Sequence, residues 1–284
     1  MRTIKQQHRA VSAPIDDLVT YRALPTRSVE HLDPFLFLNH HGPQTYKPGN
    51  RGLPFGPHPH RGFETVTFIL AGDIMHEDTG GHQSIINAGG IQWMTAGRGL
   101  IHAEVSSPEF KRTGGPLEIL QLWVNLPARH KMTEPRYVGL QEPEIPRISL
   151  DEGRVSLQAI AGEWAGTAGA VQPLADIALA TVYFRAGGRL ALTIPADHTI
   201  FCYVVRGQLR VQDQPTEALH LIELNHDGDD LHLEAQSDAV LLLGHARPFN
   251  EPIVAYGPFV MNTNAEIQQA YQDYQAGKFG QWRG

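Results

Sequence analysis

Short β-forming segments separated by turn residues occupy most of this chain. Hydrophobic runs rich in β-branched and aromatic residues lie, for example, at 64–70, 92–95, 120–126, 181–184, 201–205 and 239–243. The sequence also contains 28 glycines and 20 prolines, many of them between these runs. Strand-like runs alternating with turn residues are typical of an all-β sandwich or barrel. The length of 284 residues suits two compact domains of this kind.

The two halves of the chain resemble each other. The run FCYVVRG at 201–207 and the LRV shortly after it match the pattern of TVTFILAG at 65–72: a hydrophobic strand, a glycine turn and a return strand. A duplicated barrel unit explains both the length and the strand density. We therefore expect one domain at 1–131 and a second at 132–284, with the polar, proline-bearing stretch 127–146 as their connection.

One helix is expected near the C-terminus. Apolar residues recur at helical spacing within 265–276, Asn264 stands where an N-cap is expected, and Gly277 follows as a stop signal. The second domain should therefore end in a helix.

Composition and charge exclude several classes of function. Hydrophobic residues at 42% and charged residues at 19% are globular values. The net charge of −7 is spread without a basic stripe, so we expect no direct binding to nucleic acid. The chain shows neither a signal peptide nor a run approaching the roughly 20 apolar residues of a membrane span. With Cys202 as its only cysteine it can form no intrachain disulfide, and we expect a cytoplasmic protein.

Two histidine-containing motifs stand beside strand-like runs. In HPHRGFETVTFILAG, His58 and His60 are two residues apart, and in AGRGLIHAEVSSPE the same spacing separates His102 from Glu104. Residues i and i+2 of a strand point to one face, and the prolines around His58 favour an extended chain. If both strands face one barrel lumen, three histidines and one carboxylate can form a metal site there.

The alternative is that these histidines are ordinary residues at strand edges. A single HxH pair is more often that than a pair of ligands, and HAE alone is weaker evidence still. The two motifs together with glycine turns at Gly72, Gly97 and Gly99 favour the metal site.

The motifs HPHRGFETVTFILAG and QWMTAGRGLIHAE resemble the two metal motifs of a cupin, in the version found in the pirin family. The stretches FLFLNHHGP, LQLWVNLP, GPFVMNT and EIQQAYQDYQAGKFG extend the resemblance from about residue 34 to the C-terminus. The resemblance implies an all-β bicupin of two stacked antiparallel barrels of the jelly-roll type, of which only the N-terminal barrel binds metal.

Carried over residue by residue, the ligands that the resemblance implies are His58, His60, His102 and Glu104. Glu64 occupies the place where many other cupins have a ligand glutamate, so we expect a group that supports the ligands without binding the metal. A charge paired with Arg61 or Arg98 is the alternative for Glu64.

The second half lacks the corresponding ligands. Counting back from Gly207 gives Thr193, Pro195 and Thr199, and the segment that corresponds to HAE is the apolar AVLLL at 239–243. One histidine, His198, does not make a site there, so the C-terminal barrel is expected to be structural.

Other histidines are expected to lie outside the metal site. His76 and His82 stand in the polar HEDTGGH stretch and are predicted to be exposed in a turn, and His40 and His41 are predicted to pack in a loop. Cys202 and its neighbour Tyr203 are predicted to be core or strand-face residues.

Three imidazoles and one carboxylate suit Fe(II), and also Mn, Co, Ni, Cu or Zn. The family resemblance implies a quercetin 2,3-dioxygenase, which opens a flavonol heterocycle with O₂ and releases carbon monoxide, with Glu104 as the catalytic residue that takes the proton of the flavonol 3-hydroxyl. Apolar residues near the motifs would pack on the aromatic substrate or simply form core; the candidates are Phe63, Phe68, Ile91, Trp93 and Met94.

A regulatory module is the second interpretation, because the resemblance also includes pirins that act through protein partners, as cofactors of transcription factors or of metabolic enzymes. The sequence shows no helix-turn-helix or basic patch for direct contact with DNA. A third interpretation, an isomerase-type cupin, would need more Lys, Arg and Tyr around the lumen than the sequence offers.

Overall fold

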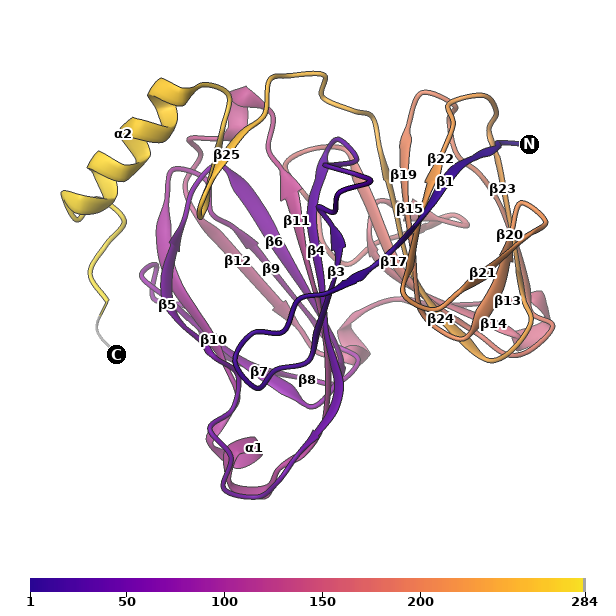
Figure 1. The fold of residues 1–284 in the computed structure, drawn as a ribbon, viewed down its shortest axis with the longest axis horizontal. Coiled ribbons are helices and arrows are strands. Elements are labelled where there is room, and N and C mark those ends of the chain that lie inside the picture. Colours follow the sequence, from indigo (N-terminus) through magenta and orange to yellow (C-terminus); the bar gives the residue numbers. More distant parts are fainter. Residues whose placement is uncertain (283–284) are drawn as a thin grey trace. The chain divides into compact units, whose positions relative to one another are not determined.

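The protein is mainly β-structure with one long helix near its C-terminus, in a computed structural model that describes residues 1–282 (Figure 1). The chain forms two compact units. The first unit contains the histidine motifs and comprises Ser12–Tyr21, Leu36–Glu142 and the chain from Phe249 onward. The second unit comprises Met1–Val11, Arg22–Phe35 and Pro143–Pro248.

These units differ from the sequence-based division into 1–131 and 132–284. Both units are discontinuous, because the first residues of the chain join the second unit and the last ones join the first. The reason lies in strand pairing: β1 (Ile4–Arg9) pairs with β22 (His220–Leu224), and Arg61 forms a bridge with Phe259.

The first unit is built on two sheets. The larger has the order β12-β9-β6-β11-β4-β3-β2 and the smaller the order β5-β10-β7-β8. Their strands are β2 (Val11–Ser12), β3 (Thr20–Leu24), β4 (Phe35–Tyr46), β5 (Phe55–His60), β6 (Phe63–Ala71), β7 (Asp73–Asp78), β8 (Gln83–Asn87), β9 (Ile91–Thr95), β10 (Leu100–Val105), β11 (Gly115–Asn125) and β12 (Arg136–Leu140). Ile69 of β6, Ile74 of β7 and Ile119 of β11 pack in one buried cluster, so side chains of both sheets meet in a shared interior.

The second unit repeats this plan. A sheet of order β1-β22-β19-β24-β17-β14-β13 accompanies one of order β18-β23-β20-β21. Their remaining strands are β13 (Arg147–Leu150), β14 (Val155–Ala161), β17 (Ile177–Phe184), β18 (Arg189–Thr193), β19 (Thr199–Arg206), β20 (Gln208–Val211), β21 (Gln214–Glu217), β23 (Asp230–Ala235) and β24 (Ala239–Ala246). The predicted duplication of an all-β barrel unit therefore appears in the matching order of the sheets.

Short elements complete the chain. They are the two-stranded sheets β15 (Glu163–Trp164) with β16 (Thr167–Ala168) and β25 (Val254–Tyr256) with β26 (Phe259–Met261), the helices α1 (Pro108–Thr113) and α2 (Asn264–Gln275), and the 3₁₀ turns Ala128–His130, Glu142–Glu144 and Asp151–Gly153. Within residues 1–282, the helices are all too short or too polar to cross a membrane.

The predicted connection at 127–146 contains a strand. Residues Arg136–Leu140 form β12, which pairs antiparallel with β9 from Arg136 opposite Thr95 to Leu140 opposite Ile91. The sequence RYVGL is a short β-forming run, and its position at the edge of the sheet suits a segment flanked by prolines.

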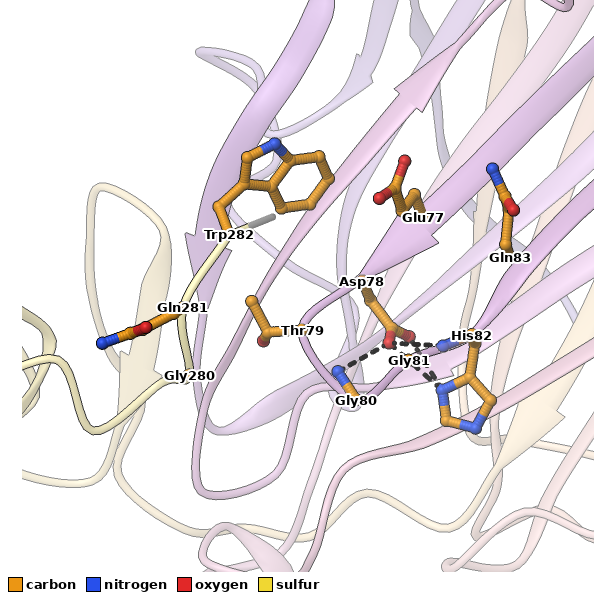
Figure 2. Close-up of a pocket in the computed structure, with 10 residues that line it drawn as sticks. All are labelled: Glu77, Asp78, Thr79, Gly80, Gly81, His82, Gln83, Gly280, Gln281 and Trp282. Atoms are coloured by element: carbon orange, nitrogen blue, oxygen red, sulfur yellow. Dashed lines mark hydrogen bonds and ion pairs between the residues drawn. The ribbon is translucent and has the colours of Figure 1, made fainter. Parts of the chain in front are cut away.

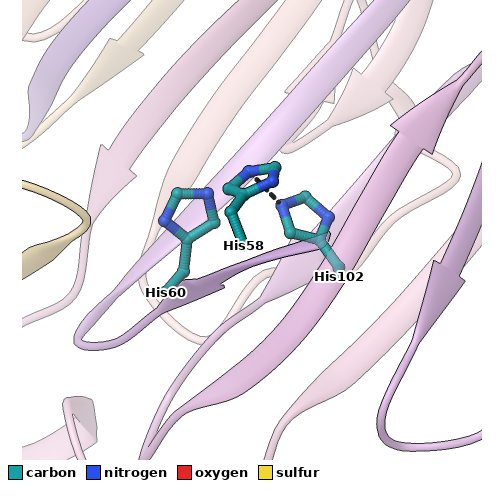
Figure 3. Close-up of side chains that lie close together, drawn as sticks. All are labelled: His58, His60 and His102. Carbon is teal, nitrogen blue, oxygen red and sulfur yellow. Dashed lines mark hydrogen bonds between the residues drawn. The ribbon is translucent and has the colours of Figure 1, made fainter. Parts of the chain in front are cut away.

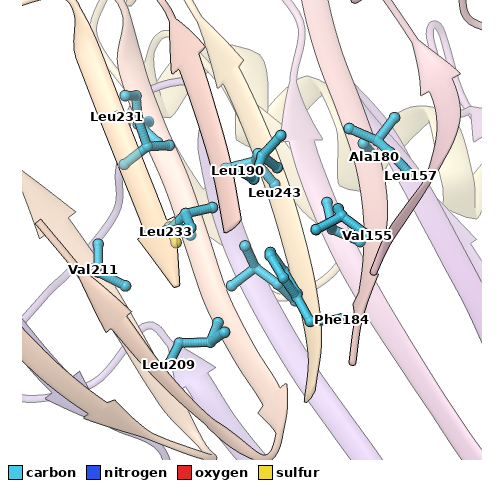
Figure 4. Packing of buried hydrophobic residues seen from close by; sticks show 14 of the residues in the cluster. Val155, Leu157, Ala180, Phe184, Leu190, Leu209, Val211, Leu231, Leu233 and Leu243 are labelled. Carbon is cyan, nitrogen blue, oxygen red and sulfur yellow. The ribbon is translucent and has the colours of Figure 1, made fainter. Parts of the chain in front are cut away.

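The second unit fills its interior with aliphatic side chains. Leu209 and Leu233 of the smaller sheet pack with Leu157 and Leu243 of the larger one in a cluster of buried residues (Figure 4). Cys202 is fully buried in the same cluster. This barrel is therefore filled by a hydrophobic core. Cys202 and its neighbour Tyr203 are both buried, as predicted.

Burial should make the thiol of Cys202 unreactive in the folded protein. Desolvation raises the pKa of Cys202 to about 12, so the reactive thiolate is scarce at pH 8. We expect a chromogenic disulfide reagent to label the native protein negligibly and to label one thiol per chain in denaturant. Fast labelling of the native protein would contradict this packing.

Helix α2 begins one residue earlier than predicted. Thr263 is the N-cap, its hydroxyl accepting a hydrogen bond from the Glu266 backbone N–H at 3.2 Å, and the predicted cap Asn264 is the first helical residue. The Glu266 carboxylate accepts a bond from the Asn262 backbone N–H at 3.1 Å. Thr-x-x-Glu is the sequence signature of a capping box, here with the Glu266 carboxylate bound to the backbone N–H one residue before the N-cap. The helix therefore starts from Thr263 rather than from Asn264.

The carboxylate of Asp273 ties α2 to Arg61, the residue that follows β5. It accepts bonds from Lys278 at 2.7 Å and from buried Arg61 at 2.8 Å, which together lower the pKa of Asp273 well below its usual range. Stabilisation from such a group is complete above the unfolded-state pKa of about 3.9 and is lost as the pH falls below it.

We therefore expect the melting temperature of the protein to fall more steeply between pH 6 and pH 3 than that of Asp273→Asn. The variant should be less stable than the parent at pH 6, and the two should converge in acid. Parallel pH profiles in a thermal melt would show that this ion pair does not contribute.

Candidate metal centre

Three imidazoles meet where β5 and β10 pair. The antiparallel register sets His58 opposite His102, and His60 lies two residues after His58 on the same strand. The ring nitrogens that the three residues offer all lie within 4.8 Å of one another (Figure 3). The two sequence motifs are thus brought together as the alternation of strand side chains predicts.

Hydrogen bonds aim two of the rings. His58 Nδ1 lies 2.7 Å from the Gly56 carbonyl oxygen, and His60 Nδ1 lies 3.2 Å from that of Pro258. A carbonyl oxygen can only accept, so each Nδ1 carries the proton and donates it. In the neutral form of these rings, Nε2 of His58 and of His60 is therefore the nitrogen whose lone pair can bind a metal ion.

The spacing of the rings also fits a metal ion. Two imidazole nitrogens bound at right angles, each about 2.1 Å from a metal ion, lie about 3 Å apart. His58 Nε2 and His102 Nε2 are 3.0 Å apart. Together with the donor set of three imidazoles, this separation shows that the residues present suit a divalent transition metal.

Burial keeps the imidazoles uncharged. Desolvation is the largest cause that lowers the pKa of His60 to about 3, and the neighbouring His58 is the second. For His102, desolvation is again the largest cause and His60 the second, and together they lower its pKa well below the usual value. Neutral imidazole is the form that binds metal, so these two ligands need not lose a proton at neutral pH.

Glu104 lies beside this cluster without belonging to it. Its carboxylate is buried and accepts a hydrogen bond from the Thr67 hydroxyl at 2.8 Å and another from the Gln121 side-chain amide. The pairing of β10 with β5 shifts register between His102 and Glu104. The structure therefore brings together the three predicted histidines and holds the predicted carboxylate through β6 and β11.

Glu64 faces the other side of β6. Its carboxylate accepts a bond from Thr95 at 2.6 Å, and burial raises its pKa. Thr67, three residues further along the strand, contacts Glu104, so alternation places Glu64 on the opposite face. The alternative pairing of Glu64 with an arginine is not seen, because Arg61 binds Asp273 and Arg98 binds Glu134.

Aromatic rings line one side of the cluster. The ring of His60 lies 5.0 Å from Phe63 and 5.3 Å from Trp123, measured between centroids, and Trp123 stacks on Phe37 at 4.6 Å. Of the five apolar candidates from the sequence, Phe63 and Met94 share the face of Thr67, and strand pairing puts Phe68, Ile91 and Trp93 on the face of Glu64. Trp123 was missed because LQLWVNLP showed no sign of which face it would turn inward.

His76 is buried beside the cluster, and the predicted exposure of this residue is wrong. Its Nε2 donates to Asp78 at 3.0 Å, and its ring stacks on Tyr137 at 4.0 Å and lies 5.4 Å from that of His102. The HED sequence belongs to β7, so His76 and Asp78 both face inward and only His82 lies in the turn, with its side chain 44% exposed. Treating IMHED as a strand with alternating side chains would have predicted that His76 and Asp78 point to the same face.

A cavity of about 580 Å³ opens on the outer side of that turn. Figure 2 shows Trp282 and Glu77 on its walls, with Asp78 and His82 joined by hydrogen bonds at its base. Its lining contains none of the three clustered histidines. The cavity is therefore a surface feature beside β7 and β8, separate from the imidazole cluster.

His40 and His41 lie in β4 rather than in a loop. Both are buried; His40 Nε2 lies 3.0 Å from Glu118, and His41 Nδ1 lies 2.8 Å from the Thr20 hydroxyl. They stay outside the metal cluster, as predicted, although they pack in the sheet.

Comparison with known proteins adds a family to this geometry. The pirin family model matches residues 17–124, and the model of the pirin C-terminal cupin domain matches residues 179–280. The chain belongs to the pirin family.

The relatives of this pirin include proteins named for an enzymatic activity and proteins with solved structures. A Pseudomonas aeruginosa protein that carries the name "putative quercetin 2,3-dioxygenase" is 41% identical over 94% of this chain and 92% of its own length. Human pirin is 38% identical over 91% of this chain and 87% of its own. The crystal structure of a quercetin 2,3-dioxygenase from Acinetobacter baumannii matches with a TM-score of 0.93 at 38% identity, covering 99% of both chains. The predicted family and the bicupin fold class are confirmed.

The second unit of this pirin contains a pair of histidines that the sequence did not predict. His198 Nδ1 and His245 Nδ1 lie 3.0 Å apart at the end of the aliphatic interior, and the ring of His245 packs edge-on against Trp164. In the part of the chain that the structure describes, the metal-capable groups of three or more donors comprise only His58, His60 and His102. The pair is explained by one imidazole donating a hydrogen bond to the other.

We expect this pirin to bind about one divalent ion per chain. His60→Ala should lower the Co²⁺ retained after gel filtration from about one equivalent to close to none, because it removes one of three clustered donors. His82→Ala, which removes a half-exposed imidazole outside the cluster, is the matched control and should retain full occupancy. Equal metal content in both variants would exclude the cluster as the binding site.

Proposed function

We propose that this pirin is a metal-dependent dioxygenase that cleaves flavonols of the quercetin type with O₂. The observation that carries the proposal is the convergence of three imidazoles, two of them oriented by hydrogen bonds from Nδ1 to backbone carbonyls, next to a buried carboxylate. The names of the similar bacterial proteins support the same activity.

The proposed ligands are His58, His60, His102 and Glu104, and Fe(II) is the proposed ion. Three imidazoles and a carboxylate suit this ion, and Mn, Co, Ni, Cu and Zn remain chemically compatible with them. When bound, such an ion supplies positions at which substrate and O₂ can meet and polarises the oxygen that it holds.

Glu104 is the proposed proton acceptor. Thr67 and Gln121 each donate one hydrogen bond to its carboxylate, which fixes the group next to the histidine cluster. A carboxylate oxygen has two lone pairs, so each oxygen keeps acceptor capacity after these bonds. Glu104 can therefore take the proton of a flavonol 3-hydroxyl while its two donors hold it in position.

The aromatic side of the cluster would receive the rings of the substrate. Phe63, Trp123 and Phe37 form a stack that ends at His60, and offset or edge-on contacts between such rings favour a flat aromatic ligand. These side chains would orient the flavonol with its hydroxyl toward Glu104 and exclude water from that side.

The test is turnover of quercetin by protein purified without oxygen and loaded with Fe(II), followed as loss of the flavonol absorbance after O₂ is added. Removing the proton acceptor in Glu104→Gln should lower kcat by about 100-fold or more. Glu109→Gln, which neutralises an exposed carboxylate on α1, should match the parent.

Metal bound to the histidines without turnover of quercetin would contradict the proposal. In that case the better-supported function would be a regulatory module that acts through protein partners, and the metal would serve to shape a binding surface.

A further inference from the structure

The segment around Pro258 is hydrogen-bonded to the end of β5, the strand that carries His58 and His60. The Pro258 carbonyl oxygen accepts a bond from His60 Nδ1 at 3.2 Å and one from the Arg61 backbone N–H at 3.4 Å. The Val260 backbone N–H in turn donates to the Arg61 carbonyl oxygen at 3.0 Å. Residues almost 200 positions away in sequence thus complete the hydrogen bonding of β5 at its end.

The side chain of Arg61 extends this contact to α2. It is 3% exposed, its Nη1 donates to Asp273 at 2.8 Å, and its guanidinium lies 4.7 Å from the centre of the Phe279 ring. Its Nε donates to the Arg98 carbonyl oxygen at 2.6 Å, in the turn that leads into the strand of His102. A buried guanidinium needs its counter-charge, so Asp273 makes the position of Arg61 depend on α2.

Two glycines let the segments approach closely. A Cβ on Gly62, whose φ is +87°, would stand 2.0 Å from the Val260 carbonyl oxygen, and a Cβ on Gly99 would stand 2.6 Å from the Phe279 ring. Buried Lys131 adds a further link, since its Nζ donates to the carbonyl oxygens of Gly62 and Val260. The C-terminal segment is therefore closely packed against the residues that follow β5 and precede β10.

We propose that the C-terminal segment, residues 258–279, is a working part of the metal centre: its docking orients His60, and metal binding and docking stabilise each other. The inference rests on the proposed metal site. Pro258 fixes the tautomer and the direction of His60 through its carbonyl, and Asp273 acts through Arg61 as a positioning residue. Coupling between two such events is reciprocal: docking raises metal affinity by the same factor by which bound metal favours docking, so a change that undocks the segment should weaken metal binding.

The test measures Co²⁺ affinity by competition with a chromophoric chelator in the full-length protein. Asp273→Asn and Phe279→Ala loosen the segment by charge and by packing, respectively, and each should weaken Co²⁺ binding by about 10-fold, the lower end of the range for groups that support a ligand. Glu109→Gln makes the same charge change as Asp273→Asn at an exposed site of the same unit, and its affinity should equal that of the parent.

Two further readouts separate positioning from general loosening. The visible absorption bands of bound Co²⁺ should shift in Asp273→Asn, because the His60 ring is no longer held in one direction. In the parent, Co²⁺ should slow hydrogen exchange in peptides covering residues 258–279 and leave β20–β21 of the second unit unchanged.

Faster exchange of α2 in Asp273→Asn and Phe279→Ala with Co²⁺ affinity and spectrum equal to those of the parent would overturn the inference and leave the proposed function standing. Failure of the parent itself to bind Co²⁺ would overturn both, because the site on which the inference rests would then be absent.

Discussion

The pairing of β5 with β10 is the interaction on which the imidazole cluster depends. It sets His58 across from His102 and leaves His60 on the same face. Because side chains alternate along a strand, a slip of one residue would turn both β5 histidines to the other side. β5 is an edge strand, where its two prolines are tolerated, and their missing N–H groups also make its free edge a poor template for another chain. The same residues that set the extended conformation of the motif therefore protect the edge on which it lies.

The two barrels share a strand plan and differ in what fills them. The second encloses an aliphatic cluster, whereas the first buries Glu104, which bonds half-buried Gln121, and the His76–Asp78 pair in its interior. Most of these polar groups have partners, but His102 Nδ1 and Glu64 Oε2 are buried without one among the described residues. The first barrel thus has the more polar interior around its histidines.

Sequence reasoning reached the fold class and the histidines because both depend on local alternation. The two-residue period of a strand places His58 and His60 on one face, and the full ligand set was implied by the resemblance to the pirin family. Sequence reasoning failed where contacts with residues far away in the sequence decide whether a side chain is buried. His76 stood in a glycine-rich stretch that suggested exposure, and its burial follows from the pairing of β7 with β10 and from the Tyr137 ring supplied by an unexpected strand. Likewise, no local pattern connects Pro258 with His60, since their contact exists only after the chain has folded back.

That return of the chain gives the protein an order of assembly. A ribosome delivers the clustered histidines well before the Pro258 carbonyl, Asp273 and Phe279. Until those residues emerge, His60 lacks its hydrogen-bond acceptor and Arg61 lacks its counter-charge. The first unit cannot mature as an N-terminal domain during synthesis, as domains generally do. The finished geometry of the imidazole cluster therefore arises only after residues 258–279 have been made, and a chain that stops before Pro258 would carry all three clustered histidines without the contact that orients His60.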